Sequence, residues 1–352
     1  MLDSRSKLKD FAPIPPPRLV AWETARACNP ACRRCRTEAR KEPSAGESNP
    51  SEAENLIKQL SAFSALPMTI LSGGEPLTRP DILELAGLRT SMGFRLPLST
   101  NGANLTEKSA DDIKKAGAAR LSLSLDAPNP TGHDEFRGQA GSFETTVESA
   151  KLLKRRQPPF QINSAITARN IRQTEAISEL ALSSGAVAHH VFLLVPAGRT
   201  KQSDTNSLPQ AYEQSPIKLK QREGRLKLEF KATCAPQYRR IGLQLGLKPS
   251  PRSSRGCLGG RFMFIGHDGQ VGACGRLRLP AGNARQARPV EIYDASPLFA
   301  QLRDKKCRQG RCGRCDFFDI CGGCRAGAYA QGDRLGPEPL CPHQPKNSKG
   351  DG

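Results

Sequence analysis

Long apolar runs are missing from this sequence. No stretch approaches the ~18 consecutive apolar residues of a membrane-spanning helix, and the opening residues, MLDSRSKLKDFAPIPPPRL, lack the apolar run of a signal peptide. Aromatic residues are also scarce, with one Trp and four Tyr, and hydrophobic residues make up only 37% of the chain. We therefore expect a cytoplasmic globular protein with some polar loop and tail, and no membrane partner.

A nucleic-acid-binding motif is also missing, although the chain is strongly basic. The formal net charge is +19, but Lys and Arg are spread along the sequence and no aromatic-flanked basic cluster occurs. A positive surface attracts anionic ligands in general without selecting one. We expect no nucleic-acid partner.

Cysteine, by contrast, is abundant and clustered, with twelve residues in the chain. In a reducing compartment, clustered cysteines bind metal or carry out redox chemistry more often than they form disulfides, which are typical of secreted proteins. With 352 residues, the chain is long enough for one barrel-sized domain and a smaller one.

Short apolar, β-branched runs alternate with segments of helical spacing from residue 19 to 196, which is typical of βα units around a parallel sheet. The predicted strands cover 19–24, 68–73, 95–101, 120–126, 160–167 and 189–196. The predicted helices cover 51–64, 79–92, 106–116, 142–156 and 171–184, the first opening on a capping box of Ser51 and Glu54. Six units predict an α/β fold with a partial (β/α)6 barrel, whose ligand residues follow the carboxyl ends of the strands.

Composition divides the chain into segments. Residues 1–17 are an N-terminal extension, 18–197 the partial barrel, 198–232 a polar connector with one helix near 208–221, 233–342 a small cysteine-rich domain, and 343–352 a disordered tail. The cysteine-rich segment has many glycines and little periodicity. It therefore needs covalent or metal staples, because its own apolar core is too small.

The first cysteine motif follows the first predicted strand. Cys28, Cys32 and Cys35 have the spacing C-x3-C-x2-C. Three thiolates in one tight loop can hold three irons of a [4Fe–4S] cluster and leave the fourth iron open to a ligand. A zinc site completed by one further residue is the alternative.

Polar motifs follow the next predicted strands in turn. Gly73-Gly74-Glu75-Pro76 comes after the second strand, Thr100-Asn101 after the third, Ser124 and Asp126 after the fourth, and Arg137 lies in the stretch His133–Gly138. Each alone is compatible with turn or capping chemistry. In this order, and together with the cysteine motif, they resemble the radical S-adenosylmethionine (SAM) superfamily.

This resemblance implies a [4Fe–4S] cluster on Cys28, Cys32 and Cys35 that binds SAM. It implies that Arg137 pairs with the SAM carboxylate in a bidentate fork and that Val195 and Pro196 line the adenine. The residues implied to contact SAM are Gly73, Gly74, Glu75, Pro76, Thr100, Asn101, Ser124, Asp126 and Arg137.

The C-terminal cysteines are similar to the SPASM extension of the same superfamily, which houses one or two auxiliary [4Fe–4S] clusters. The similarity implies one cluster on Cys312, Cys315, Cys321 and Cys341, and a second on Cys257, Cys274 and Cys324 with Cys234 or Cys307 as candidate fourth ligand. The spacing between Cys321 and Cys324 is one residue shorter than usual in that extension. Structural zinc on 312–324 is the alternative.

Several segments resemble the anaerobic haem-biosynthesis branch, whose members modify acetate or propionate side chains of iron tetrapyrroles. They are 18–24, 35–39, 162–170, 191–199, 233–241, 256–260, 264–275 and 321–329. The resemblance implies that a 5′-deoxyadenosyl radical removes hydrogen from a propionate, which then loses CO2 and one electron to become a vinyl group. It also implies an electron donor such as ferredoxin or flavodoxin.

Other substrates and other classes of function stay open. Related sequences act on peptides, so a peptide-modifying maturase is the second hypothesis, and a non-enzymatic metal-binding protein is the third. On the tetrapyrrole hypothesis, Arg239, Arg240 and Arg261 are candidates for binding substrate carboxylates. Cys234 or one residue of the pair His189-His190 is a candidate for contacting the tetrapyrrole iron.

Overall fold

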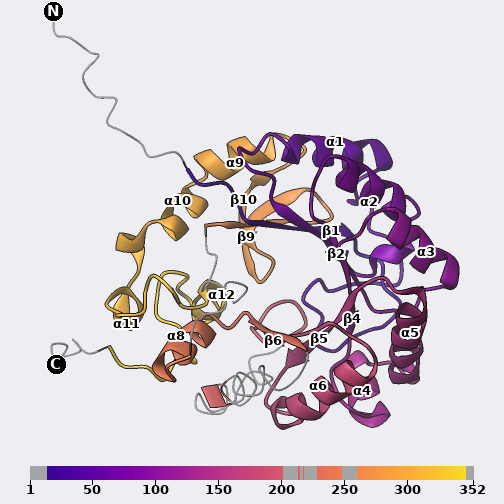
Figure 1. Ribbon diagram of the computed structural model, residues 1–352. Coiled ribbons are helices and arrows are strands. Elements are labelled where there is room, and N and C mark those ends of the chain that lie inside the picture. The colour runs from indigo at the N-terminus through magenta and orange to yellow at the C-terminus, as the bar shows by residue number, and fades with distance from the viewer. Residues whose placement is uncertain (1–13, 201–212, 215–216, 218–227, 248–259, 346–352) are drawn as a thin grey trace, which may run out of the picture.

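A curled sheet of ten strands organises this computed structural model, which describes residues 14–200, 213–214, 217, 228–247 and 260–345 (Figure 1). The strand order is β10-β9-β8-β1-β2-β3-β4-β5-β6-β7. Neighbours from β8 through β1 to β7 are parallel, whereas β9 and β10 run antiparallel. The strands are β1 Leu19–Ala25, β2 Met68–Gly73, β3 Pro97–Thr100, β4 Arg120–Ser124, β5 Phe160–Ile166, β6 Ala188–Leu193, β7 Glu229–Thr233, β8 Phe262–Ile265, β9 Gln270–Cys274 and β10 Leu277–Asn283.

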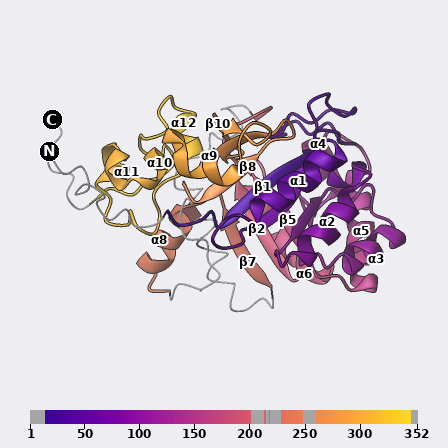
Figure 2. The same ribbon diagram turned by 90° about the horizontal axis from the view of Figure 1, so that it is seen from above.

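Helices of the βα units cover the convex face of the sheet, as Figures 1 and 2 show. The main core lies between these layers, where Ile57 of α1 and Leu153 of α5 share one buried cluster with Trp22, Leu98 and Leu121 of the strands. The helices are α1 Pro50–Leu60, α2 Ile82–Ser91, α3 Glu107–Lys115, α4 Pro130–Arg137, α5 Ser142–Arg156, α6 Thr174–Ser183, α8 Gln237–Gln244, α9 Pro289–Ala295, α10 Pro297–Arg303, α11 Gly310–Gly313 and α12 Arg325–Tyr329. Short 3-10 turns occur at Pro76–Thr78, Ile171–Gln173 and Lys305–Cys307.

The partial α/β barrel predicted from the sequence is confirmed. All six predicted strands are present in the predicted order, and the five predicted helices lie between them. The predicted capping box of Ser51 and Glu54 is wrong by two residues. Asn49 caps α1 and pairs with Glu52, because Pro50 already occupies the first helical turn.

The sheet continues beyond the expected end of the barrel at residue 197. β7 pairs with β6 and crosses the expected border at 232/233, while β8 pairs with β1 and carries β9 and β10 with it. The expected connector helix near 208–221 falls mostly outside the described residues. The cysteine-rich part is thus attached to both edges of the parallel sheet.

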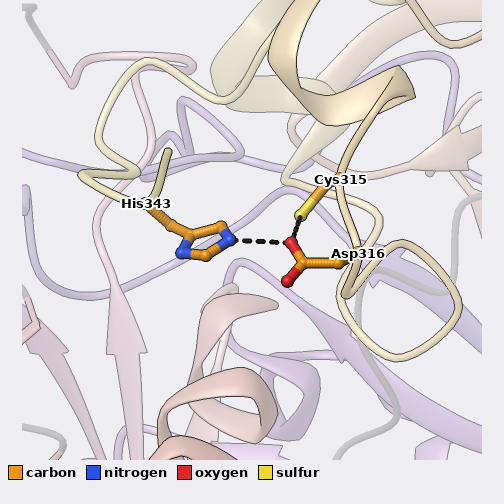
Figure 3. A group of neighbouring side chains, drawn as sticks. All are labelled: Cys315, Asp316 and His343. Carbon is orange, nitrogen blue, oxygen red and sulfur yellow. Dashed lines mark hydrogen bonds and ion pairs between the residues drawn. The ribbon is translucent and has the colours of Figure 1, made fainter. Parts of the chain in front are cut away.

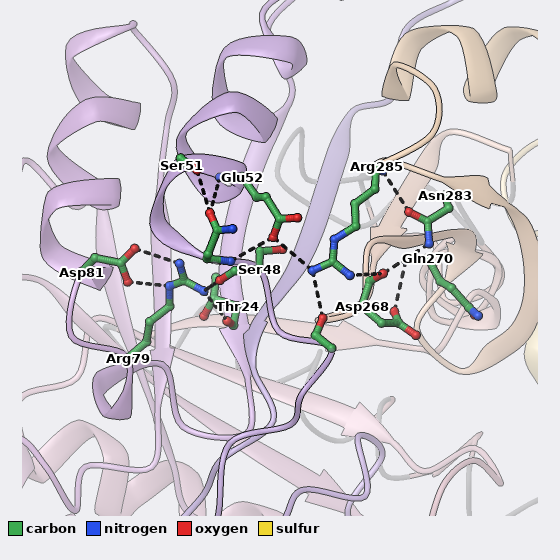
Figure 4. Close-up of polar contacts among 12 residues, drawn as sticks. Thr24, Ser48, Ser51, Glu52, Arg79, Asp81, Asp268, Gln270, Asn283 and Arg285 are labelled. Carbon is green, nitrogen blue, oxygen red and sulfur yellow. Dashed lines mark hydrogen bonds and ion pairs between the residues drawn. The ribbon is translucent and has the colours of Figure 1, made fainter.

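The loop between β1 and α1 is tied to the turn between β8 and β9 through Arg285, which follows β10 (Figure 4). Its guanidinium donates to the Gly46 carbonyl at 3.0 Å, to Glu52 at 3.2 Å and to the Asp268 carbonyl at 3.2 Å. This side chain therefore joins residues about 240 positions apart in the sequence, from both halves of the chain.

The same loop is tied to the start of α2 through the buried Arg79, also drawn in Figure 4. Arg79 donates to the carbonyls of Thr24 and Ser48 at 3.1 and 2.7 Å and pairs with Asp81 at 2.6 Å. Because this loop carries the first cysteine motif, these two arginines fix the segment that holds it. No helix in the described part of the chain is long and apolar enough to span a membrane.

Candidate active site

The first three cysteines lie in the loop that follows β1. Its start is closed by a hydrogen bond of 2.7 Å from the Cys28 amide to the Arg40 carbonyl. Arg199, just beyond β6, donates to the carbonyls of Cys32 and Ala39 at 3.0 Å each. Sequence reasoning did not identify Arg199 as a site residue, because a lone arginine in a turn carries no signal of its own.

Gly198 lets the chain beyond β6 approach this loop closely. It has a φ of +60°, and a Cβ there would lie 2.4 Å from the carbonyl oxygens of Cys35 and Arg36. The Arg199 amide then donates to the Cys35 carbonyl at 3.0 Å. Only glycine fits this contact without backbone movement.

Donors point at the sulfur atoms of all three cysteines. Asn101 lies 3.7 Å from Cys28 Sγ through Nδ2, and Arg137 lies 3.8 Å from Cys32 Sγ through Nη1. The Ala39 amide donates to Cys35 Sγ at 3.4 Å. Such contacts stabilise thiolates, the form in which cysteine binds iron.

The protein environment affects these thiols differently. Burial, reinforced by the nearby Glu75 carboxylate, raises the pKa of Cys28 to about 12. Burial also acts on Cys35, but hydrogen bonds from Thr37 and Ala39 outweigh it and lower the pKa of Cys35. A bound cation would favour the deprotonated form of Cys28, which fits a metal-bound role.

The glycine turn after β2 packs directly against the cysteine loop. A Cβ on Gly74 would lie 2.2 Å from the Ala27 carbonyl oxygen, and Gly73 has a φ of +144°. The amides of Gly74 and Glu75 donate to the carbonyls of Ala25 and Ala27, each at 2.7 Å. The two glycines thus align this turn beside the first cysteine.

Glu75 supports the site from inside the protein. Its carboxylate is fully buried and accepts hydrogen bonds from Thr100 Oγ1 at 2.7 Å, the Asn101 amide at 2.7 Å and the Leu77 amide at 3.0 Å. Burial raises the pKa of Glu75. The described hydrogen bonds of the Glu75 carboxylate, including the one from the Thr100 hydroxyl, are made with protein groups. They join the turn after β2 to the end of β3.

Asp126 and Arg137 form an ion pair of 2.6 Å beside the second cysteine. The other Asp126 oxygen accepts from the Ala165 amide at 2.7 Å, and its own amide donates to His133 Nδ1 at 3.1 Å. Burial alone would lower the pKa of Arg137, but Asp126 and Cys32 raise it. Arg137 therefore links Asp126 to the cysteine loop, and its expected pairing with a SAM carboxylate stays a prediction.

The remaining barrel candidates lie at the same end of the sheet. Ser124 ends β4 half-buried, and Pro76 opens the 3-10 turn after the glycines. The Val195 carbonyl accepts from Arg276 at 3.3 Å, which brings the turn after β9 close to it. The predicted residues are therefore gathered at the carboxyl ends of β1 to β6.

A second group of cysteines lines a hollow in the C-terminal part. Four cysteines share it with Arg240 and Glu338: they are Cys312, Cys315, Cys321 and Cys341. Burial raises the pKa of Cys321 to about 12 and also raises the pKa values of Cys315 and Cys341. The set expected from the sequence to bind one auxiliary cluster is thus brought together, and its donors suit iron.

The second expected set is only partly described. Cys257 lies outside the described residues. Cys274 ends β9, and Cys324 caps α12, which packs against the neighbouring strand β10. Of the two candidate fourth ligands, Cys234 directly follows β7 and is half-buried, and Cys307 Sγ lies 3.6 Å from Asp304.

Asp316 and His343 lie beside Cys315, one of the four cysteines that line the hollow (Figure 3). His343 Nε2 lies 2.9 Å from Asp316 Oδ1, and Cys315 Sγ lies 3.9 Å from the same oxygen. These three side chains are close enough to share a metal ion. Because Cys315 also lines the hollow, we count it with the other three cysteines.

Comparison with known proteins identifies the family. The Radical SAM superfamily profile matches residues 22–171. The AdoMet-dependent heme synthase of Methanosarcina barkeri is 41% identical over 94% of this chain and 97% of that protein, and that of Oleidesulfovibrio alaskensis is 40% identical over 94% and 88%. Streptococcus suis SuiB bound to precursor peptide SuiA is similar in fold, with a TM-score of 0.76 at 18% identity over 93% of this chain and 76% of SuiB. The chain is therefore an enzyme of the radical SAM superfamily and belongs to the same family as the proteins named AdoMet-dependent heme synthase.

Proposed function

We propose that this enzyme converts propionate side chains of an iron tetrapyrrole into vinyl groups in haem biosynthesis. The observation that carries the proposal is the similarity to AdoMet-dependent heme synthases, which extends over 97% of the Methanosarcina barkeri protein. It includes both the barrel and the cysteine-rich region. The reaction releases one CO2, one hydrogen atom and one electron from each propionate.

The residues of the barrel fit a [4Fe–4S] cluster and SAM. Cys28, Cys32 and Cys35 would hold three irons, and the loop that carries them contains no fourth cysteine. Backbone carbonyls of the turn at Gly73 and Gly74, which the two glycines let pack against the cysteine loop, would accept hydrogen bonds from the SAM ammonium. When bound and reduced by one electron, the cluster and SAM supply a 5′-deoxyadenosyl radical.

Site residues proposed from the sequence divide into two roles. Asn101 and Arg137 contact the cysteine sulfurs directly, so we assign them to holding the cluster and SAM. Glu75 and Thr100 are hydrogen-bonded to each other inside the protein and fix the turns after β2 and β3. Ser124 and Asp126 lie at the end of β4, where hydroxyl and carboxylate groups suit the polar part of SAM.

The electron released from the substrate needs an acceptor within the protein. Cys312, Cys315, Cys321 and Cys341 would hold an auxiliary [4Fe–4S] cluster in their shared hollow, and a second would lie on Cys257, Cys274 and Cys324. We propose a ferredoxin or flavodoxin as the external reductant. A peptide substrate, as in SuiB, is the second candidate, but SuiB is only 18% identical to this chain.

Turnover by the anaerobically reconstituted, dithionite-reduced enzyme tests the proposal. With SAM and iron-coproporphyrin III, mass spectrometry should detect 5′-deoxyadenosine and a porphyrin that has lost CO2. A Cys28→Ala variant should give neither product, whereas Ser91→Ala, at the exposed end of α2, should behave as wild type. Deoxyadenosine with unchanged porphyrin would reject the tetrapyrrole substrate while keeping the radical chemistry.

A further inference from the structure

The concave face of the sheet is divided into an apolar and a polar half. Strand residues alternate between buried side chains under the helices and half-buried side chains on this face. On β8 and β1, and over the first part of β2, the half-buried residues are apolar: they are Phe262, Phe264, Leu19, Ala21, Met68 and Ile70. A half-exposed apolar strip of this kind suits a flat apolar ligand.

Charged and polar side chains occupy the opposite half, on β4 to β7. Arg120 Nη2 lies 3.3 Å from Glu229 Oε2, although β4 and β7 are three strands apart. Arg120 also donates to Gln161 at 3.3 Å, and Gln161 contacts His190 Nδ1 at 2.8 Å. These contacts close the end of the concave face where the parallel strands begin.

His190 also belongs to this network. Its Nδ1 is taken by Gln161, and its Nε2 lies 3.8 Å from Glu229 Oε1. Burial lowers the pKa of His190, so the ring is neutral near pH 7. Its neighbour His189 points away, into the core, where it contacts Ser164 and Ser178.

Lys231 is the exception in the polar half. It is half-buried, and among the described residues it has no hydrogen bond or ion pair. Its longer-range electrostatic interactions are an attraction to Glu229 and a repulsion from Arg120. Two cations therefore share one carboxylate, and Arg120 makes the direct contact with it. A partly desolvated ammonium without a partner is unfavourable unless an anion joins it.

Lys231 is also placed toward the radical site. It lies two residues beyond Glu229 along β7, nearer the carboxyl ends of the strands, and in register with His190, Asn163 and Ser124. Three strand spacings of ~4.8 Å separate it from Ser124, or about 14 Å along the curved sheet. This separation suits a ligand of tetrapyrrole size, with one side chain at the radical site and another at Lys231.

We propose that Lys231 binds a carboxylate side chain of the tetrapyrrole while Phe262, Phe264 and Ile70 contact its apolar ring, an inference that rests on the proposed function. Lys231 is then a specificity residue for anionic tetrapyrroles. Glu229 and Arg120 keep its surroundings close to neutral, so that the incoming carboxylate completes the charge balance.

Porphyrin binding to the reconstituted enzyme tests this role without turnover. Titration with iron-coproporphyrin III, followed by its Soret absorbance, should give an affinity at least about tenfold weaker for Lys231→Met than for wild type, the effect of one charge-assisted hydrogen bond. Lys231→Arg should restore most of that loss. Lys108→Met, which removes an equal charge from the exposed face of α3, should bind as wild type.

The tetramethyl ester of iron-coproporphyrin III separates a charge effect from damage to the fold. Because the ester has no carboxylate, wild type and Lys231→Met should bind it equally. Two results would overturn the role of Lys231: equal affinity of both proteins for the free acid, or an affinity loss in Lys231→Met that is the same for the acid and the ester. If wild type still decarboxylates the acid, the proposed function is not affected by either result. Wild type that neither binds nor decarboxylates it would refute the proposed function as well.

Discussion

Arg137 is the residue on which the barrel site depends most. Its guanidinium neutralises Asp126, which is 1% exposed, and contacts the Cys32 sulfur. Removing it would leave a buried carboxylate without a counter-charge, which costs about 3–5 kcal/mol in comparable cases. The residue therefore has a structural role in addition to its proposed role toward SAM.

We predict that Arg137→Met lowers the thermal unfolding midpoint by roughly 5–10 °C. Deoxyadenosine formation should fall at least about tenfold because a charged donor beside the cluster is lost. Arg156→Met is the matched control, since Arg156 pairs with Asp111 at 2.9 Å on the surface and should shift the midpoint by only about 1–2 °C. Equal shifts in both variants would contradict the buried-pair interpretation.

The sequence predicted the role of a residue where a motif determines that role. It did not predict roles that depend on which face of a strand a side chain occupies or on packing between distant segments. The cysteine spacing identified Cys28, Cys32 and Cys35 as one group, and the structure holds them in one loop. The sequence did not distinguish His189 from His190, because only the strand shows which of the two faces the core. Arg240, one of three candidates for binding substrate carboxylates, pairs with Glu213 and lines the four-cysteine hollow, contacts that no sequence pattern showed.

At the scale of elements, the turn after β2 must lie against the cysteine loop for both to work. We predict that Gly74→Ala lowers iron retention after reconstitution by up to about four irons per chain and strongly reduces SAM cleavage. The reason is the 2.2 Å approach between an added Cβ and the Ala27 carbonyl. Gly87→Ala on α2 is the control: it meets nothing within 4 Å and should keep all iron while gaining about 0.8–1 kcal/mol of helix stability.

The fully buried His189 joins β6 to its neighbours β5 and α6 through Ser164 and Ser178. Burial lowers the pKa of His189 from 6.5 to about 3. Below pH 6.5 the unfolded chain binds a proton that the folded protein does not, so stability falls as the pH drops from 6.5 toward 3.

We predict that His189→Gln removes part of this pH dependence. Between pH 7.5 and 5.5, the thermal midpoint of wild type should fall about 2–4 °C further than that of the variant. At pH 7.5 the variant itself should be less stable by about 1–3 kcal/mol, because the two serine contacts are lost or weakened. Parallel falls in wild type and variant would refute this assignment.

The elements that sequence reasoning missed are short. α4 begins at Pro130 and contains Gly132, so its apolar spacing is too weak to predict a helix, although it positions His133 and Arg137. β8 has only four residues and pairs with β1, which lies more than 200 residues earlier in the sequence. Such a long-range pairing depends on the assembled sheet and leaves no local pattern.

At the scale of the whole molecule, the cysteine-rich part is joined to the barrel by one continuous sheet. The sequence predicted a barrel and a separate cysteine-rich domain that begins at residue 233. In the structure β7 crosses this border, and β8, which lies beyond it, pairs with β1 of the barrel. The four-cysteine hollow lies beside α8, which follows β7 directly. Loss of metal from the hollow should therefore lower the stability of the barrel as well.

We predict that Cys341→Ser removes about four irons and four sulfides per chain and abolishes porphyrin decarboxylation. SAM-bound cluster signals in electron paramagnetic resonance should persist, since Cys28, Cys32 and Cys35 are untouched. Ser91→Ala, at the exposed end of α2, is the control and should keep the wild-type metal content. Unchanged iron in Cys341→Ser would reject a cluster in this hollow.

Transfer of deuterium from substrate to SAM-derived product tests the central claim most directly. Iron-coproporphyrin III deuterated at the propionate carbons next to the ring should be incubated with SAM and the reduced enzyme, and the 5′-deoxyadenosine analysed by mass spectrometry. We predict one deuterium in each deoxyadenosine for each CO2 released. Deoxyadenosine without deuterium, formed while the porphyrin keeps all its carboxylates, would contradict propionate decarboxylation by this enzyme.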